Sequence, residues 1–119
     1  MRIRTNVWIE NAEGEVVFGL GRQRILEAIQ ECGSLKAAAE KLGFSYRGLW
    51  ARLRLSEKRL GFPLVDSHPG RGEHAGTKLT PRALELLERY RRALREIYDA
   101  SDRAHSEHIE EMFGTRKAD

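Results

Sequence analysis

Residues whose side chains can bind nucleic acid lie close together in the stretch SYRGLWARLR, residues 45–54. Arginine can hydrogen-bond guanine or clamp a phosphate, and aromatic rings can pack on thymine methyls or sugars. If this stretch is helical, several of these side chains share one face, since steps of three to five residues return to the same side. They are Tyr46, Arg47, Trp50, Ala51 and Arg54, preceded by the capping residue Ser45. This face predicts a surface that reads duplex DNA; the alternative is that the aromatics are core residues and the arginines only solvate the helix.

A second group of basic residues follows in the segment HPGRGEHAGTK, residues 68–78. Arg71 stands between two glycines, with His68 and His74 nearby, and Lys78 follows at the base of the segment. Glycine lets a backbone approach a duplex closely, and an arginine at a hairpin tip suits a narrow minor groove. We therefore expect Arg71 and Lys78 to contact DNA, although an ordinary surface loop explains the segment equally well.

Positive charge is concentrated in the middle of the chain. The 119 residues carry a formal net charge of +3. Between Ser34 and Thr80, nine Lys or Arg residues stand against four Asp or Glu residues, which gives that stretch a net charge of +5. An anionic partner such as nucleic acid is the natural match for this distribution.

Two short helical patterns joined by a glycine turn position the DNA-reading face. Ser34 can cap a helix that Gly43 ends, and Ser45 can cap the next helix. This arrangement is a helix-turn-helix, whose second helix lies in the major groove and meets base edges with its first turns. Ser34 and Lys36, at the start of the first of these helices, complete the predicted DNA-binding residues. The second helix has a buried line at Leu49, Leu53, Ser56 and Leu60.

Further segments surround the helix-turn-helix. Residues 1–18 alternate apolar and polar side chains around a turn-prone stretch at Asn11 to Gly14, which predicts a β-hairpin. A preceding helix ends at Gly33, and a second hairpin after Gly61 forms a wing. Thr80 and Pro81 then start a long helix. The expected fold is mainly α with small β hairpins: one domain over residues 1–119, with a hairpin at 1–18, a winged helix-turn-helix at 19–80 and a long C-terminal helix at 81–113.

The long helix carries an apolar seam that can pair with a second copy of the chain. Steps of three and four residues are typical of a helix that packs along another helix. The seam consists of Leu87, Tyr90, Leu94, Ile97, Ser101 and Ala104. We expect a homodimer held by the first four of these residues.

Three stretches resemble a known family of regulators: GSLKAAAEKLGFSYRGLW, RLGFPLVDS and LTPRALELLERY. With the glycine-rich segment, they are similar to the N-terminal DNA-binding domain of the molybdate-responsive ModE regulators and, more loosely, to the winged helix-turn-helix of LysR-type regulators. The most specific part is Ser45, Tyr46, Arg47 and Trp50, in a likeness that covers residues 18 to 100. The resemblance implies a winged-helix transcription factor that dimerises through its long C-terminal helix.

The resemblance also carries an expectation about molybdate. ModE proteins with a sensor have C-terminal molybdate-binding domains, whereas this chain ends at Asp119. We therefore expect no tight molybdate binding by this chain, with any molybdate response supplied by a separate sensor protein.

The other residues that could carry chemistry do not indicate an enzyme or a cofactor site. Cys32 has no second cysteine to pair with, and we expect it to be a small buried hydrophobe. His105 and His108 have the spacing of metal ligands, but a solvated, polar helix end explains them better. No phosphate loop, metalloprotease helix or nucleophile elbow occurs in the sequence.

The expected function is that of a DNA-binding transcriptional regulator. We expect it to be cytoplasmic, because no apolar run is long enough to span a bilayer. Two alternatives stay open. One is an adaptor module that uses the same fold to bind protein, which an apolar, exposed hairpin at residues 3–18 would favour. The other is a metal- or oxyanion-responsive regulator.

Overall fold

The computed structural model describes residues 1–68 and 76–114 of the chain. The chain divides into two compact units, one formed by Trp8–Glu88 and the other by Met1–Val7 together with Arg89–Asp119. The assignment of residues 1–119 to a single domain stays a prediction. Among the described residues, every helix is too short or too polar to cross a membrane.

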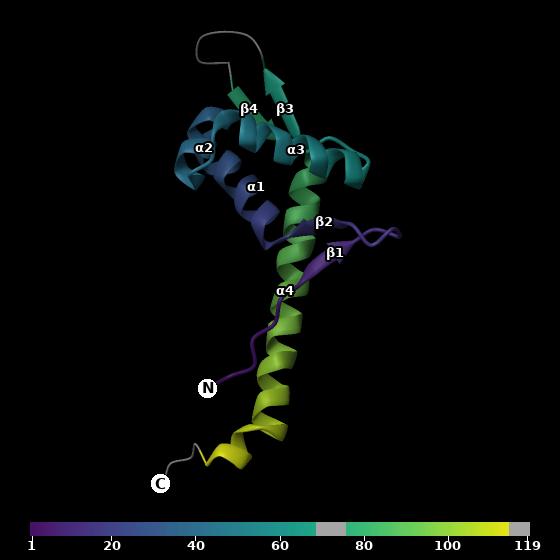
Figure 1. The fold of residues 1–119 in the computed structure, drawn as a ribbon, viewed down its shortest axis with the longest axis vertical. Coiled ribbons are helices and arrows are strands. Elements are labelled where there is room, and N and C mark those ends of the chain that lie inside the picture. The colour runs from purple at the N-terminus through teal and green to yellow at the C-terminus, as the bar shows by residue number, and fades with distance from the viewer. Residues whose placement is uncertain (69–75, 115–119) are drawn as a thin grey trace. The chain divides into compact units, whose positions relative to one another are not determined.

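Helices and two antiparallel strand pairs make up the described structure (Figure 1). The prediction of a mainly α fold with small β hairpins and a long C-terminal helix is confirmed. The elements are β1 (Trp8–Glu10), β2 (Val16–Gly19), α1 (Leu20–Cys32), α2 (Leu35–Leu42), α3 (Tyr46–Leu60), β3 (Val65–His68), β4 (Gly76–Leu79), α4 (Pro81–His108) and the 3₁₀ helix η2 (Glu110–Phe113).

Side-chain caps and glycine turns set the ends of the helix-turn-helix. The Ser34 hydroxyl accepts a hydrogen bond from the Ala37 amide at 3.1 Å. Ser45 accepts one from the Gly48 amide at 2.9 Å, so both predicted caps are confirmed. Gly43, between α2 and α3, has a φ of 79°, a left-handed conformation that strongly favours glycine. The turn that joins the two helices therefore follows from local sequence.

The wing is tied to the helices at its base. Strands β3 and β4 pair in antiparallel register, with Val65 opposite Leu79 and Asp66 opposite Lys78. The Thr77 amide donates to the Gly33 carbonyl at 3.1 Å, which links β4 to the end of α1. A side chain at Gly76 would place its Cβ 3.0 Å from that same carbonyl oxygen, so a glycine is required where the two backbones meet. The predicted tip, including Arg71, lies outside the described residues.

A buried core holds the unit Trp8–Glu88 together. Leu49, Leu53 and Ser56 are buried as predicted, and Leu60 is half-buried. Apolar side chains from β2, α1, the segment before β3 and α4 complete this core: Phe18, Leu26, Ile29, Leu64 and Leu87. The buried side of α3 thus leaves its opposite side free for a partner.

The N-terminal hairpin is shorter than the sequence pattern suggested. Its turn is confirmed, since the Asn11 side-chain oxygen accepts hydrogen bonds from the amides of Glu13 and Glu15, each at 3.0 Å. The first strand begins at Trp8, however, and not near residue 3. Residues 1–7 instead belong to the unit that contains most of α4, where the Tyr90 hydroxyl donates to the Val7 carbonyl at 2.8 Å.

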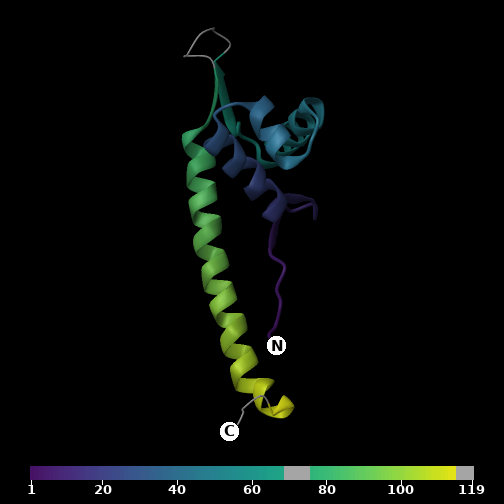
Figure 2. The same ribbon diagram turned by 90° about the vertical axis from the view of Figure 1, so that its left-hand side faces the viewer.

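Helix α4 is one continuous helix (Figure 2), but its apolar seam is not free. Leu87, Tyr90 and Leu94 are 1%, 3% and 8% exposed, so these proposed dimerisation residues are already covered within a single chain. Burial also raises the pKa of Tyr90, with a smaller contribution from Tyr98. Only Ile97 of the four keeps a half-exposed side chain. Three of the four residues expected to hold a homodimer are therefore buried within one chain, and the homodimer itself stays a prediction.

Candidate nucleic-acid interface

The predicted reading face of α3 lies on the surface. Tyr46 is 53% exposed, and Arg47, Ala51 and Arg54 are also exposed. Trp50 is half-buried, so it partly supports the helix and partly faces outward. The alternative in which Tyr46 is a core aromatic does not fit this exposure. The face combines cationic donors with aromatic and small apolar groups, which is the chemistry needed to contact phosphates and base edges.

Arg54 is held in place by two neighbours on its own helix. Its guanidinium lies over the Trp50 ring, 4.5 Å from the ring centroid, and donates to a Glu57 carboxylate oxygen at 3.3 Å. The side chain nevertheless stays 63% exposed. Stacking and pairing restrict its rotamers, so less conformational entropy is lost when it binds a phosphate or base.

Glu57 joins the reading helix to the wing, a role that the sequence did not reveal. Its side chain is only 12% exposed. One carboxylate oxygen accepts from the Leu64 amide at 2.8 Å and from the Val65 amide at 3.4 Å, while the other accepts from Arg54. A single carboxylate therefore orders both an interface arginine and the start of β3. A glutamate near the end of an amphipathic helix gives no sequence signal for this role.

Two further arginines lie beside the reading face: Arg52 on α3 itself and Arg22 on α1. Arg52 is exposed, stacks on the Phe44 ring at 4.2 Å and donates to the Gly48 carbonyl at 3.3 Å. Arg22 of α1 is half-buried and donates to the Ser56 hydroxyl at 2.8 Å. Burial lowers the pKa of Arg22, and the nearby charges of Arg59 and Arg52 lower it further. The sequence placed Ser56 in the buried line but could not identify its partner.

The remaining predicted DNA-binding residues lie on other elements of the same unit. Ser34 is half-buried and its hydroxyl is used as the α2 cap, whereas Lys36 on the first turn of α2 is exposed. Lys78 is exposed on β4. Arg71, outside the described residues, cannot be placed with them.

The metal hypothesis gains no support from the described residues, which contain no group of three or more potential His, Cys, Asp or Glu ligands. His105 is 8% exposed, contrary to the expected solvated end of the helix, while His108 is exposed and lies 3.8 Å from Glu107. Cys32 is half-buried.

The capped helix pair, the outward basic face of α3 and the β3–β4 pair together define a winged helix-turn-helix DNA-binding domain. Residues 20–84 match the family model described as bacterial regulatory helix-turn-helix protein, lysR family. The chain belongs to this family, whose members are DNA-binding transcriptional regulators and not enzymes.

Curated relatives include two ModE proteins. The molybdenum transport protein ModE of Herbaspirillum seropedicae is 37% identical over 85 residues, which cover 70% of this chain and 32% of that protein. The transcriptional regulator ModE of Haemophilus influenzae is 38% identical over 69 residues, covering 58% and 27%. The chain thus spans about a third of the length of these relatives.

Solved structures give the same fold. A crystal structure of the DNA-binding domain of CbnR with DNA is 30% identical, with a TM-score of 0.52, and the match covers 71% of this chain and 93% of that one. The DNA-binding domain of BenM, in complex with its benA site 1 DNA, covers 78% and 99% at 22% identity and a TM-score of 0.55, a likeness of fold alone. The resemblance to ModE and LysR-type regulators is confirmed.

Proposed function

We propose that this chain binds duplex DNA as a homodimer and regulates transcription, with α3 as the helix that enters the major groove. The observation that carries the proposal is the outward face of α3, where Arg47 and Arg54 lie beside Tyr46 and Trp50 on a helix that follows a glycine turn. The net charge of +5 over residues 34–80 supports it, because phosphate neutralisation dominates affinity for DNA.

The interface residues divide into two roles. Arg47, on the first turn of α3, is suited to a guanine edge, with Tyr46, Trp50 and Ala51 packing on sugars and thymine methyls. Lys36 at the start of α2 and Lys78 on the wing are suited to phosphates, and we assign Arg71 to the minor groove. Ser34 and Ser45 act mainly by presenting helix N-termini, whose free N–H groups favour phosphate.

Dimerisation needs a surface other than the buried seam. A stripe of apolar residues beside it stays exposed or half-exposed: Ala93, Ile97, Ala100 and Ala104. Their steps of four, three and four residues follow one side of α4, and small side chains let two helices approach closely. We therefore assign the homodimer to this stripe, which shares Ile97 and Ala104 with the original seam.

Molybdate is assigned to a separate sensor. A tight oxyanion site needs several donors that converge in an enclosed pocket. The ModE relatives are about three times as long as the region that matches this chain. We therefore do not assign molybdate binding by those proteins to residues 1–119. We expect a calorimetric titration of this chain to show no stoichiometric heat at micromolar molybdate.

The test of the DNA-binding proposal is the salt dependence of affinity. Genomic fragments selected by the protein supply the duplex, and the same sequence as a single strand is the control. We expect preference for the duplex and a fall in affinity by orders of magnitude between low and moderate salt, because bound counterions are released on binding. An affinity that hardly changes with salt, or that is equal for single strands, would contradict the proposal.

A second candidate function is supported by the N-terminal hairpin. Trp8, Ile9 and Leu20 are exposed apolar residues at this hairpin and the start of α1, and such residues are typical of protein contacts. A Trp8→Ser variant separates the two functions in a reporter assay. If Trp8→Ser abolishes regulation while Arg47→Ala leaves it intact, the chain acts as an adaptor and not through DNA.

A further inference from the structure

The N-terminal segment is fastened along α4 by two polar contacts. Tyr90 donates its hydroxyl hydrogen to the Val7 carbonyl, and the hydroxyls of Thr5 and Ser101 share a hydrogen bond of 2.5 Å. Both contacts lie within the unit formed by residues 1–7 and the later part of α4. The side chains that precede Thr5 are therefore held close to the helix.

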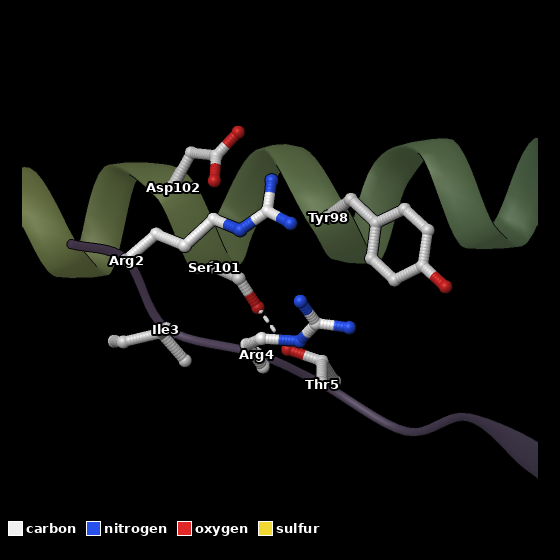
Figure 3. A pocket seen from close by; sticks show the side chains of 7 residues that line it. All are labelled: Arg2, Ile3, Arg4, Thr5, Tyr98, Ser101 and Asp102. Carbon is white, nitrogen blue, oxygen red and sulfur yellow. Dashed lines mark hydrogen bonds between the residues drawn. The ribbon is translucent and has the colours of Figure 1, made fainter.

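A pocket with a volume of about 410 Å³ lies between this segment and α4. Figure 3 shows the side chains of Arg2 and Arg4 extending from the segment toward Tyr98 and Ser101 on the helix. Asp102 also lines the pocket, one residue beyond Ser101. The volume falls within the range of about 300–1,000 Å³ that is usual for small-molecule sites.

The charges around the pocket do not neutralise each other. Within the described part of the chain, neither Arg2 nor Arg4 has an ion pair, and Asp102 is not within ion-pair distance of either guanidinium. Two arginines and one aspartate leave a net charge of +1 at the pocket. Two like charges at one site raise its positive potential, which attracts anions.

We propose that this pocket binds a small organic molecule through an anionic phosphate or carboxylate group. Two guanidinium forks offer paired N–H donors that match the oxygens of these groups. Tyr98 and Ser101 line the pocket from the helix, and Ile3 lines it from the N-terminal segment. Bound anion would join the N-terminal segment to α4 more firmly. Because both arginines are exposed, affinity for the bare anion is modest.

The test is a titration of the whole chain, without an N-terminal tag, with inorganic phosphate at mildly alkaline pH, where phosphate is mostly a dianion. Nuclear magnetic resonance follows the backbone amides and arginine side chains. We expect saturable shifts confined to residues 2–5 and 98–102. Arg2→Gln and Arg4→Gln should each weaken binding by about two- to fivefold, and the double variant should abolish saturation. Asp102→Asn, which removes the opposing charge, should strengthen it.

Arg24→Gln is the matched control, since Arg24 is an exposed arginine on α1, outside this unit. An equal loss in Arg24→Gln, shifts centred on residues 34–80, no saturation in the unmodified chain or weaker binding by Asp102→Asn would each overturn the proposal. Acetate is the second probe: saturable binding of acetate at the same residues assigns carboxylates to the site as well, and binding of phosphate alone assigns phosphates. DNA is absent from the experiment, so its failure leaves the proposed function untouched.

Discussion

The exposed arginines of α3 differ in the contacts that hold their side chains. Arg54 stacks on Trp50 and pairs with Glu57, whereas no hydrogen bond or ion pair of Arg47 is recorded within the described residues. Arg47 also lies on the first turn of α3, the part of a recognition helix that meets base edges. Under the proposed function, Arg47 could therefore turn toward a base without breaking a contact within its own chain.

Replacing Arg47 by alanine should change sequence preference. Loss of a bidentate contact to guanine should cost about 1–3 kcal/mol and relax discrimination at one base pair. Lys36→Ala should instead weaken binding to all sequences alike and reduce the salt slope by about one unit, because a phosphate contact carries no base information. Both variants are measured against a panel of single-base operator variants at two salt concentrations. The opposite pattern would mean that α3 is not the reading element.

At the scale of elements, the wing and the reading helix are ordered by the same carboxylate. Glu57 is nearly buried and accepts the amide hydrogens of Leu64 and Val65 where β3 begins. An unsatisfied buried amide costs more than the net gain of one hydrogen bond. The angle at which the wing leaves α3 therefore depends on a side chain and not only on the turn between them.

Glu57→Ala should destabilise the protein by about 1–3 kcal/mol, because the Leu64 amide loses its partner. Glu57→Gln keeps an acceptor oxygen for this amide but cannot pair with Arg54, so stability should largely return. The measurements are thermal unfolding and hydrogen exchange at the Leu64 amide. Glu96→Ala, an exposed change on α4, is the control for loss of one carboxylate. Equal stability of Glu57→Ala and the unmodified chain would show that the contact is dispensable.

At the scale of the whole molecule, α4 has two apolar sides that differ in burial. The side that carries Leu87, Tyr90 and Leu94 is buried within one chain. The neighbouring stripe through Ile97 keeps exposed or half-exposed apolar groups. A homodimer that pairs half-sites on DNA would use this second side.

Ile97→Glu should yield folded monomers, since a carboxylate placed in a helix pair loses hydration without a partner. Binding to paired half-sites should weaken in parallel. Leu94→Glu should instead unfold the protein, because Leu94 is 8% exposed within one chain. Sedimentation and circular dichroism distinguish the two outcomes, and Arg95→Glu, on the other side of α4, is the control. A monomeric unmodified chain at high concentration would remove the dimer from the proposal.

Elements with local signals could be predicted from the amino-acid sequence. The caps at Ser34 and Ser45 each satisfy an amide only three residues away, and Gly43 supplies a left-handed turn that few other residues tolerate. The exposed face of α3 followed from helical periodicity in the same way. These signals were enough to predict the helix-turn-helix and the outward position of Tyr46 and Arg47.

Contacts between residues far apart in the chain could be seen only in the folded structure. Arg22 and Ser56 are 34 positions apart, Val7 and Tyr90 are 83 apart, and Thr5 and Ser101 are 96 apart. No periodicity encodes such pairs, because a helical pattern shows which side is apolar but not what will cover it. For this reason the sequence could not predict that Leu87, Tyr90 and Leu94 are buried within one chain, or that an arginine pocket lies along α4.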